Sequence, residues 1–143
     1  MARGQWERAA QILRELLEAE PDRIDLRLNL GVALYSMGRF SEAMVEFERV
    51  VEQAPDTAAA WANLGAAANQ LGHVQRAEEA LTRACQLAPK LRDVHLNLAL
   101  LRLKQGRLAE ALAELETELA NHPDNQAARA LAAALERELF RKR

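Results

Sequence analysis

The sequence predicts an all-α fold, on the strength of its composition, the spacing of its prolines and glycines, and the pattern of its apolar residues. Alanine and leucine account for 29 and 24 of the 143 residues, whereas isoleucine, valine and threonine together number 11. Because alanine and leucine favour helices and β-branched residues favour strands, a sheet-based fold is disfavoured. With a net charge of −2 and 28% charged residues, the chain fits neither a disordered segment nor a strongly basic nucleic-acid binder.

A period of 34 residues runs through the whole chain. It is carried by the prolines Pro21, Pro55, Pro89 and Pro123, the glycines Gly4, Gly38, Gly72 and Gly106, and the alanines Ala9, Ala43, Ala77 and Ala111. A fixed period of this length predicts an architecture of stacked structural repeats. Residues separated by multiples of 34 are called equivalent positions below.

Each repeat reads as two helices. In residues 24–56, one apolar stripe at helical spacing ends before Gly38, and a second ends before Pro55. Glycine tolerates the left-handed conformation that ends a helix, and the residue before a proline is disfavoured in one. Asp56 and Thr57 are expected to cap the helix that follows. A repeat is therefore a first helix, a tight turn, a second helix and a short loop.

The phase of the array leaves a half repeat at each end. The N-terminal segment matches a second helix alone, and the C-terminal segment continues in the position of a first helix. We therefore expect the chain, residues 1–143, to be one array with about nine helices. Its parts are a half repeat, three full repeats and a terminal helix, at residues 5–21, 24–56, 58–90, 92–124 and 125–143.

The residue pattern within each unit points to a known family. The best copy consists of Trp61, Leu64, Gly65, Ala68, Ala77, Leu81, Ala84 and Pro89. This set resembles the tetratricopeptide repeat, whose pattern is Trp-x2-Leu-Gly-x2-Tyr followed by Ala, Phe, Ala and Pro. The resemblance covers essentially the whole chain and implies a right-handed α-solenoid of stacked antiparallel helix pairs. Within each pair, the small residues Gly31, Gly65 and Ala99 are expected to meet Ala43, Ala77 and Ala111.

Catalytic and metal-binding motifs are not evident. The histidines, His73, His95 and His122, form no HxxxH or HxH pair, and the chain has no phosphate loop or nucleophile elbow. Cys85 is the one cysteine, so an intramolecular disulfide is excluded and a small packing residue is expected. We predict that the chain is not an enzyme and needs no metal or cofactor.

Charged residues in the third repeat are expected on the surface. Glu114, Glu116 and Glu118 are interpreted as solvated helix residues rather than as an acid–base pair. Arg102 and Glu118 each stand at a position of the repeat that is usually occupied by an apolar or small residue. They are expected either to pair with each other or to reach solvent.

A candidate binding surface follows from the resemblance, because the first helices of tetratricopeptide arrays line a concave face that holds extended peptides or short helices. Asn29, Asn63 and Asn97 stand at equivalent positions on these helices, and their amides can hydrogen-bond a peptide backbone. This row resembles the asparagine ladder of nucleocytoplasmic glycosyltransferases; a structural role is the alternative. The other predicted contact residues are Leu28, Val32, Tyr35, Asn69, Leu96, Leu100 and Lys104.

The ligand expected from this groove is an amphipathic helix or an apolar peptide with some basic residues. Asp25 and Asp93 give the apolar groove an acidic edge. The Lys and Arg clamp of the chaperone-binding members is absent at the matching positions. Trp61 is expected in the core, since it occupies the family's structural tryptophan position.

The predicted function is a non-catalytic scaffold that binds a peptide or helix of a partner protein. One alternative is a regulatory or substrate-recruiting arm of a larger enzyme, for example a glycosyltransferase-like protein. Another is a self-assembly module that forms a homo-oligomer through its end helices. For the self-assembly alternative, the expected contact is the open face of the N-terminal helix, with Trp6, Leu13 and Leu17.

Location and source are weakly bounded by the sequence. No apolar run is long enough to span a membrane, and Met1–Arg8 does not lead into a signal peptide. A cytoplasmic location is expected, although a fragment can have lost a targeting segment. Arginine outnumbers lysine 16 to 3, which favours a GC-rich bacterial source. The arginines are scattered among glutamates, so no nucleic-acid partner is expected.

Overall fold

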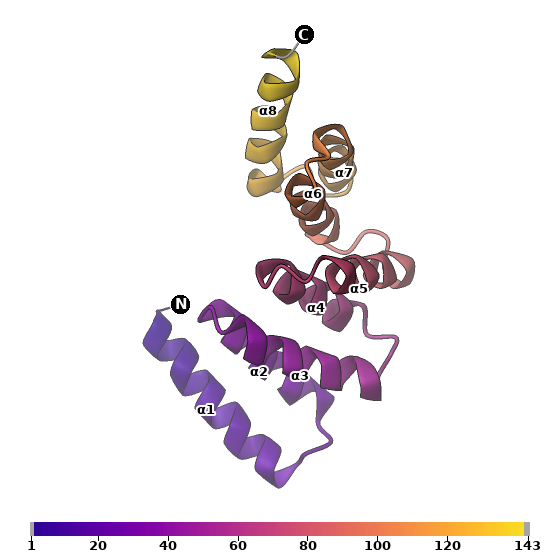
Figure 1. Cartoon of the computed structure of the whole chain (residues 1–143). Coiled ribbons are helices and arrows are strands. Elements are labelled where there is room, and N and C mark those ends of the chain that lie inside the picture. The colour runs from indigo at the N-terminus through magenta and orange to yellow at the C-terminus, as the bar shows by residue number, and fades with distance from the viewer. Residues whose placement is uncertain (1, 142–143) are drawn as a thin grey trace. The chain divides into compact units, whose positions relative to one another are not determined.

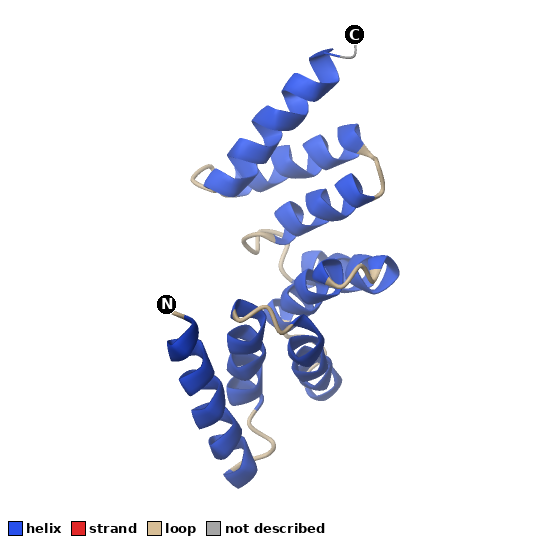
Figure 2. Ribbon diagram, turned by 60° about the vertical axis from the view of Figure 1, so that its left-hand side comes forward, coloured by secondary structure: helices blue, strands red, loops and turns tan. Residues whose placement is uncertain are grey.

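The computed structural model describes residues 2–141, and in that range the chain is helical throughout, with short connecting loops (Figure 2). Its helices are α1 (Arg3–Ala19), α2 (Ile24–Ser36), α3 (Phe40–Gln53), α4 (Ala58–Gln70), α5 (Val74–Leu87), α6 (Val94–Lys104), α7 (Leu108–Asn121) and α8 (Gln126–Arg141). The all-α class is confirmed. The described residues form eight helices rather than about nine, because three pairs with one helix at each end amount to eight.

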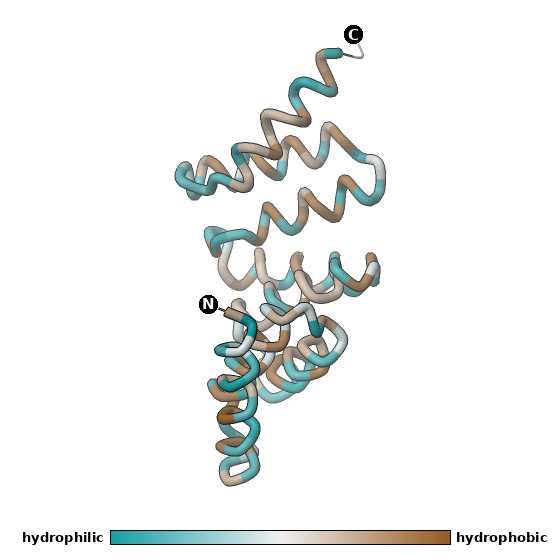
Figure 3. The backbone as a smooth tube through the Cα atoms, turned by 90° about the vertical axis from the view of Figure 1, so that its left-hand side faces the viewer, coloured by the Kyte–Doolittle hydropathy of each residue, from teal (hydrophilic) through white to brown (hydrophobic). Residues whose placement is uncertain are grey.

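The chain divides into two compact units, Met1–Leu87 and Ala88–Arg143, which we call unit 1 and unit 2. In unit 1, each of α1 to α4 packs against the next helix along the chain, up to α5; in unit 2, α6 packs on α7 and α7 on α8 (Figure 1). Hydrophobic and hydrophilic segments alternate along the helices (Figure 3). Every helix buries part of its apolar residues, for example Leu17 on α1, Leu30 on α2 and Leu115 on α7.

The glycine turns form as predicted. Gly38, Gly72 and Gly106 have φ angles of 77°, 76° and 75°, in the left-handed region. After the first of these turns, the Arg39 N–H donates to the Leu34 carbonyl at 2.9 Å, and the other two turns repeat this bond. This is the Schellman closure of a helix C-terminus, and it returns the chain antiparallel to the helix it has left.

The predicted side-chain cap of α4 is not formed. Thr57 occupies the N-cap position, but its side chain makes no capping hydrogen bond. A capping Thr57 hydroxyl would accept a hydrogen bond from the Ala60 N–H. That N–H donates instead to the Thr57 carbonyl at 3.1 Å. A backbone turn has therefore taken the donor that a side-chain cap needs.

At Pro21, Pro55 and Pro123, the loop is closed by the side chain six residues further on. The Trp61 Nε1–H donates to the Pro55 carbonyl at 2.7 Å. At equivalent positions, Arg27 donates to the Pro21 carbonyl at 2.9 Å, and Arg129 donates to the Pro123 carbonyl. Trp61 thus has two roles, because it packs half-buried against the core and also donates an N–H to the loop. Arginine supplies the N–H donor at two other loops.

Replacing Trp61 by phenylalanine tests this contribution. The variant loses the donor to the Pro55 carbonyl, so the free energy of unfolding is expected to fall by about 0.5–1.5 kcal/mol. Urea denaturation followed by circular dichroism measures it. The matched control is Trp6→Phe, since the Trp6 indole makes no hydrogen bond to another described residue. Equal losses in the two variants would show that the hydrogen bond contributes nothing.

The close approach of paired helices differs in detail from the expectation. A Cβ atom built on Gly31 would lie 2.4 Å from the Phe47 ring, and one on Gly65 would lie 2.5 Å from Leu81 Cγ. The small residues of the first helices therefore face a large side chain of the second helix, rather than chiefly Ala43 or Ala77. The Ala77 carbonyl oxygen is a more distant neighbour of Gly65, at 3.4 Å.

Candidate functional site

The first helices of unit 1 bring two of the three predicted asparagines onto neighbouring elements. Asn29 on α2 is exposed and Asn63 on α4 is half-buried, and α2 contacts α4 directly. Neither amide makes a hydrogen bond to another described residue. At the far end of the same two helices, Gln70 Nε2 lies 3.5 Å from the Tyr35 hydroxyl, and the Tyr35 ring packs edge-on against Phe40.

The apolar residues predicted for this surface are partly committed to the core. Leu28, Val32 and Tyr35 are half-buried and pack against the core of unit 1, leaving only part of each side chain for a ligand. Asn69 was expected at the same surface, but it is only 5% exposed. A side chain so buried offers no contact area, so we leave Asn69 out of the candidate site.

In unit 2 the matching residues lie on α6 in a different state. Asn97 is half-buried, and its Nδ2 donates to the Asp93 carbonyl at 3.0 Å. Leu96 packs against the core of unit 2, whereas Leu100 is 36% exposed and Lys104 is exposed. The three asparagines are therefore not alike, because the amide of Asn97 already serves its own helix.

Both carboxylates of the predicted acidic edge have partners within the chain. Arg23 donates two hydrogen bonds to the Asp25 carboxylate, Nε to Oδ1 at 2.9 Å and Nη2 to Oδ2 at 2.7 Å. These bonds lower the pKa of Asp25 to about 2. Asp93 accepts a hydrogen bond from Asn125 Nδ2 at 2.8 Å. The charge of Asp25 is therefore compensated by Arg23, whereas the Asp93 carboxylate is hydrogen-bonded by an uncharged amide.

One pair of equivalent positions carries a different chemistry in each repeat. In the first full repeat, Arg27 forms an ion pair with Glu46 at 3.0 Å, and both side chains are nearly buried. In the third, a 2.7 Å hydrogen bond joins His95 Nδ1 to Glu114 Oε2. The second repeat has Trp61 and an alanine there. Glu114 was expected on a solvated face, but it instead connects α7 to α6.

A buried polar cluster in unit 2 was missed by the sequence analysis. Glu118 is 0% exposed, and its Oε2 accepts hydrogen bonds from the Asp93 N–H and Asn125 Nδ2, each at 3.1 Å. Asn125 is also buried, and its Oδ1 accepts the Ala128 N–H at 3.2 Å, which caps α8. Glu118 is therefore neither solvated nor paired mainly with Arg102, which lies beside Glu110 and Gln105.

The cluster also alters the local backbone. Asp93 has a φ of 71°, unusual for a residue other than glycine, and it immediately precedes α6. The α6 helix accordingly begins at Val94 and has 11 residues, against 13 in α2 and in α4. One signal was available in the sequence: Glu118 stands where Val50 and Ala84 occupy equivalent positions.

The residues predicted for self-association lie mostly on the packed side of α1. Leu17 is buried, and Trp6 and Leu13 are half-buried against the core of unit 1. The large apolar side chains of α1 that remain exposed are Ile12 and Leu16, at 46% and 43%. The α1 helix therefore has two apolar sides. One packs on the core of unit 1, and the other, which carries Ile12 and Leu16, stays exposed.

With this architecture established, comparison with known proteins identifies the class. The family model of the tetratricopeptide repeat matches residues 1–68 and again residues 68–135, so the chain belongs to the tetratricopeptide-repeat family. Repeats of this family are in general non-catalytic modules for protein interaction. A search of curated proteins gives no match.

Solved structures give the same fold. The crystal structure of MamA is similar with a TM-score of 0.83 and 23% identity, over 96% of this chain and 80% of MamA. The TPR domain of Arabidopsis OM64 has a TM-score of 0.75 and 23% identity, over 80% and 94% of the two chains. YrrB, a TPR protein with an unusual peptide-binding site, has a TM-score of 0.79 and 19% identity, over 94% and 67%.

Among residues 2–141, no helix combines the length and the apolar character that crossing a bilayer requires.

Proposed function

We propose that the chain is a protein-interaction scaffold that binds an extended peptide or a short helix of a partner protein on the first helices of unit 1. The observation that carries the proposal is the pair Asn29 and Asn63. These residues occupy equivalent positions on the contacting helices α2 and α4, and neither amide is used by another described residue. Membership of a family of interaction modules, and likeness to a peptide-binding member, support it.

The chemistry of this surface favours a ligand held mainly through its backbone. Each asparagine amide offers two donors and an acceptor, which suit the N–H and C=O groups of a peptide without reading its side chains. The exposed parts of Leu28, Val32 and Tyr35 add apolar contacts beside the amides. Since Arg23 neutralises Asp25, a strongly basic ligand gains little, and we propose a mixed apolar and polar segment.

Affinity capture followed by mass spectrometry tests the proposal, with the double variant Asn29→Ala and Asn63→Ala as the comparison. The double variant is expected to bind a captured partner about ten-fold more weakly or worse, because two backbone hydrogen bonds are worth about 1–3 kcal/mol together. Asn97→Ala is expected to have a smaller effect, since that amide already donates to Asp93.

The matched control is Asn121→Ala, which removes an amide from the end of the second helix α7. It should leave partner binding unchanged. Equal affinity of the wild type and the Asn29 and Asn63 double variant, with circular dichroism unchanged, would refute the assignment of this surface.

A further inference from the structure

The α1 helix has the position of a second helix, but the side that would face a first helix is uncovered. Leu16 is 43% exposed, whereas Val50, Ala84 and Glu118 at equivalent positions are each at most 1% exposed. Ile12 is 46% exposed, whereas the equivalent Ala80 is 0% exposed. In two of the complete pairs, the position equivalent to Ile12 faces the first helix of the same repeat, where Glu46 pairs with Arg27 and Glu114 with His95. On α1, Ile12 and Leu16 stay exposed.

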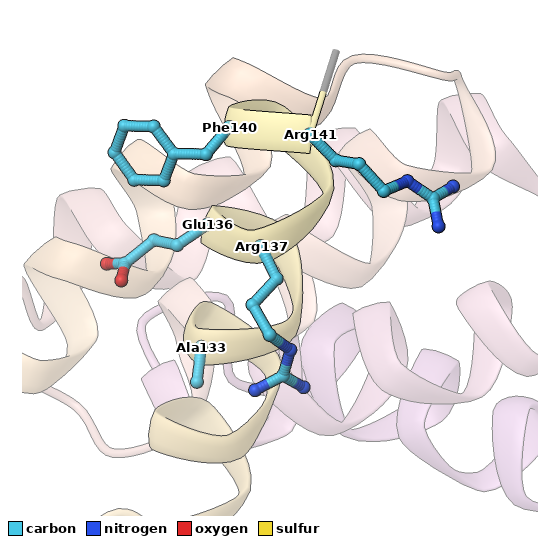
Figure 4. A pocket seen from close by; sticks show the side chains of 5 residues that line it. All are labelled: Ala133, Glu136, Arg137, Phe140 and Arg141. Carbon is cyan, nitrogen blue, oxygen red and sulfur yellow. The ribbon is translucent and has the colours of Figure 1, made fainter. Parts of the chain in front are cut away.

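The α8 helix shows the converse. It has the position of a first helix, and Ala133 is equivalent to Gly31, Gly65 and Ala99. Those three residues are buried, and the two glycines receive Phe47 and Leu81 of the second helix, whereas Ala133 is exposed. A shallow hollow lies over this side of α8, lined by Ala133, Glu136, Arg137, Phe140 and Arg141 (Figure 4).

We propose that α1 of one copy of the chain docks on α8 of a second copy as its second helix, so that the two half repeats form one complete repeat. In this arrangement Leu13, equivalent to Phe47 and Leu81, lies against Ala133. Ile12 and Leu16 are buried along the same contact. Burial of exposed apolar side chains between two complementary helix faces is what drives such association.

Charge complementarity supports a second copy as the occupant. In the third repeat, Arg102 Nε lies 3.8 Å from Glu110 Oε2, which joins the first helix to the second. The equivalent positions at the proposed contact are Glu136 on α8 and Arg8 on α1, and both residues are exposed. At the proposed contact the acidic residue is on the first helix and the basic residue on the second, the reverse of the third repeat. The two charges are still opposite, so the pair is attractive.

The contact is head-to-tail, because α1 and α8 are different surfaces. Every open assembly still presents one free α1 face at one end and one free α8 face at the other, so association continues with concentration until a ring closes or a chain of copies forms. The contact uses neither Asn29 nor Asn63, so it is independent of the proposed peptide surface.

Sedimentation velocity over a concentration series tests the proposal with two blocked variants. Ile12→Glu with Leu16→Glu blocks α1, and Ala133→Glu with Phe140→Glu blocks α8; all four side chains are exposed, so circular dichroism should be unchanged. The wild type is expected to associate progressively. Each blocked variant alone should stay monomeric, and an equal mixture of the two should form dimers and nothing larger, because only one productive contact remains.

The matched control is Val45→Glu, which places a charge at an exposed apolar residue of α3 outside both faces and should leave association unchanged. A wild type that is monomeric at every concentration would overturn the proposal. So would self-association of the α8-blocked variant by itself, since that would require an α1-to-α1 contact.

Charge reversal gives a second readout. Arg8→Glu and Glu136→Arg should each weaken association about ten-fold or less, because each places like charges together. The double variant restores an opposite pair and should recover most of the loss. Additive loss in the double variant would contradict the pairing of these two positions.

Discussion

Replacing Glu118 by alanine is expected to lower the stability of unit 2 by about 2–4 kcal/mol. The substitution leaves the Asp93 N–H without its acceptor and deprives Asn125 Nδ2 of one of two, and the side chains of Glu118 and Asn125 are both buried. An unsatisfied buried donor costs about 1–3 kcal/mol, and the cavity left by the side chain adds to this. The stability of a repeat array is roughly a sum over its repeats and their interfaces, so the loss should be local.

Native-state hydrogen exchange measures this effect helix by helix. Amides of α6, α7 and α8 should lose protection, while those of α2 and α3 in unit 1 should keep it. Glu118→Gln is the matched control, since its amide oxygen can still accept both hydrogen bonds, and its loss should be clearly smaller. Identical losses for alanine and glutamine would mean that the hydrogen bonds of Glu118 are not what stabilises the unit.

Gly31→Ala is the second substitution with a large expected effect. The new Cβ would lie 2.4 Å from the Phe47 ring, which must move, although Phe47 is only 1% exposed and has little room. Overpacking of this kind costs about 1–3 kcal/mol. Urea denaturation should therefore show a lower free energy of unfolding, despite the gain in helix propensity that alanine brings.

A second change in the same variant should reverse part of this loss. In unit 2, Ala99 shares a core cluster with Leu115, so alanine facing leucine is an arrangement that the fold already uses. Adding Phe47→Leu to Gly31→Ala is expected to cost less than the two single changes summed. The control is Gly4→Ala, where a Cβ would meet nothing within 4 Å and no loss is expected. Additive losses at positions 31 and 47 would contradict the close contact.

The helices and turns were predictable because their causes are local and recur. Gly38 recurs every 34 residues with the same left-handed conformation, and the apolar stripes on either side repeat with it. One repeat therefore predicts the next, without knowledge of long-range contacts. The same reasoning placed Trp61 in the core but not its hydrogen bond to the Pro55 carbonyl, which depends on the shape of the loop.

The misjudged residues are those whose surroundings break the repeat. Glu118 looked like a surface residue because it follows Glu114 and Glu116 in a charged segment, but the Asp93 N–H and the side chain of Asn125 hydrogen-bond it in the interior. Asp25 looked like a free acidic group because Arg23 lies outside the helical pattern. Hydrogen bonds and ion pairs of this kind depend on geometry at a single place, and periodicity carries no information about them.

The open side of α1 shows a related limit. The helix has apolar residues on two sides, and the sequence cannot say which side its neighbour α2 covers. The structure places Leu17 in the core and leaves Leu16 exposed, although the two are adjacent in the sequence. A prediction of the exposed contact residues therefore needed the packing as well as the apolar pattern.

The most direct test of the proposed function is a map of the residues that a bound peptide perturbs. The peptide is the tightest binder selected from a random display library, titrated into 15N-labelled protein and followed by amide and side-chain amide chemical shifts. We predict that the largest changes lie on α2 and α4 and include the side-chain NH2 groups of Asn29 and Asn63. Saturable shifts confined to the second helices α3 and α5, with both side-chain amides unmoved, would contradict it.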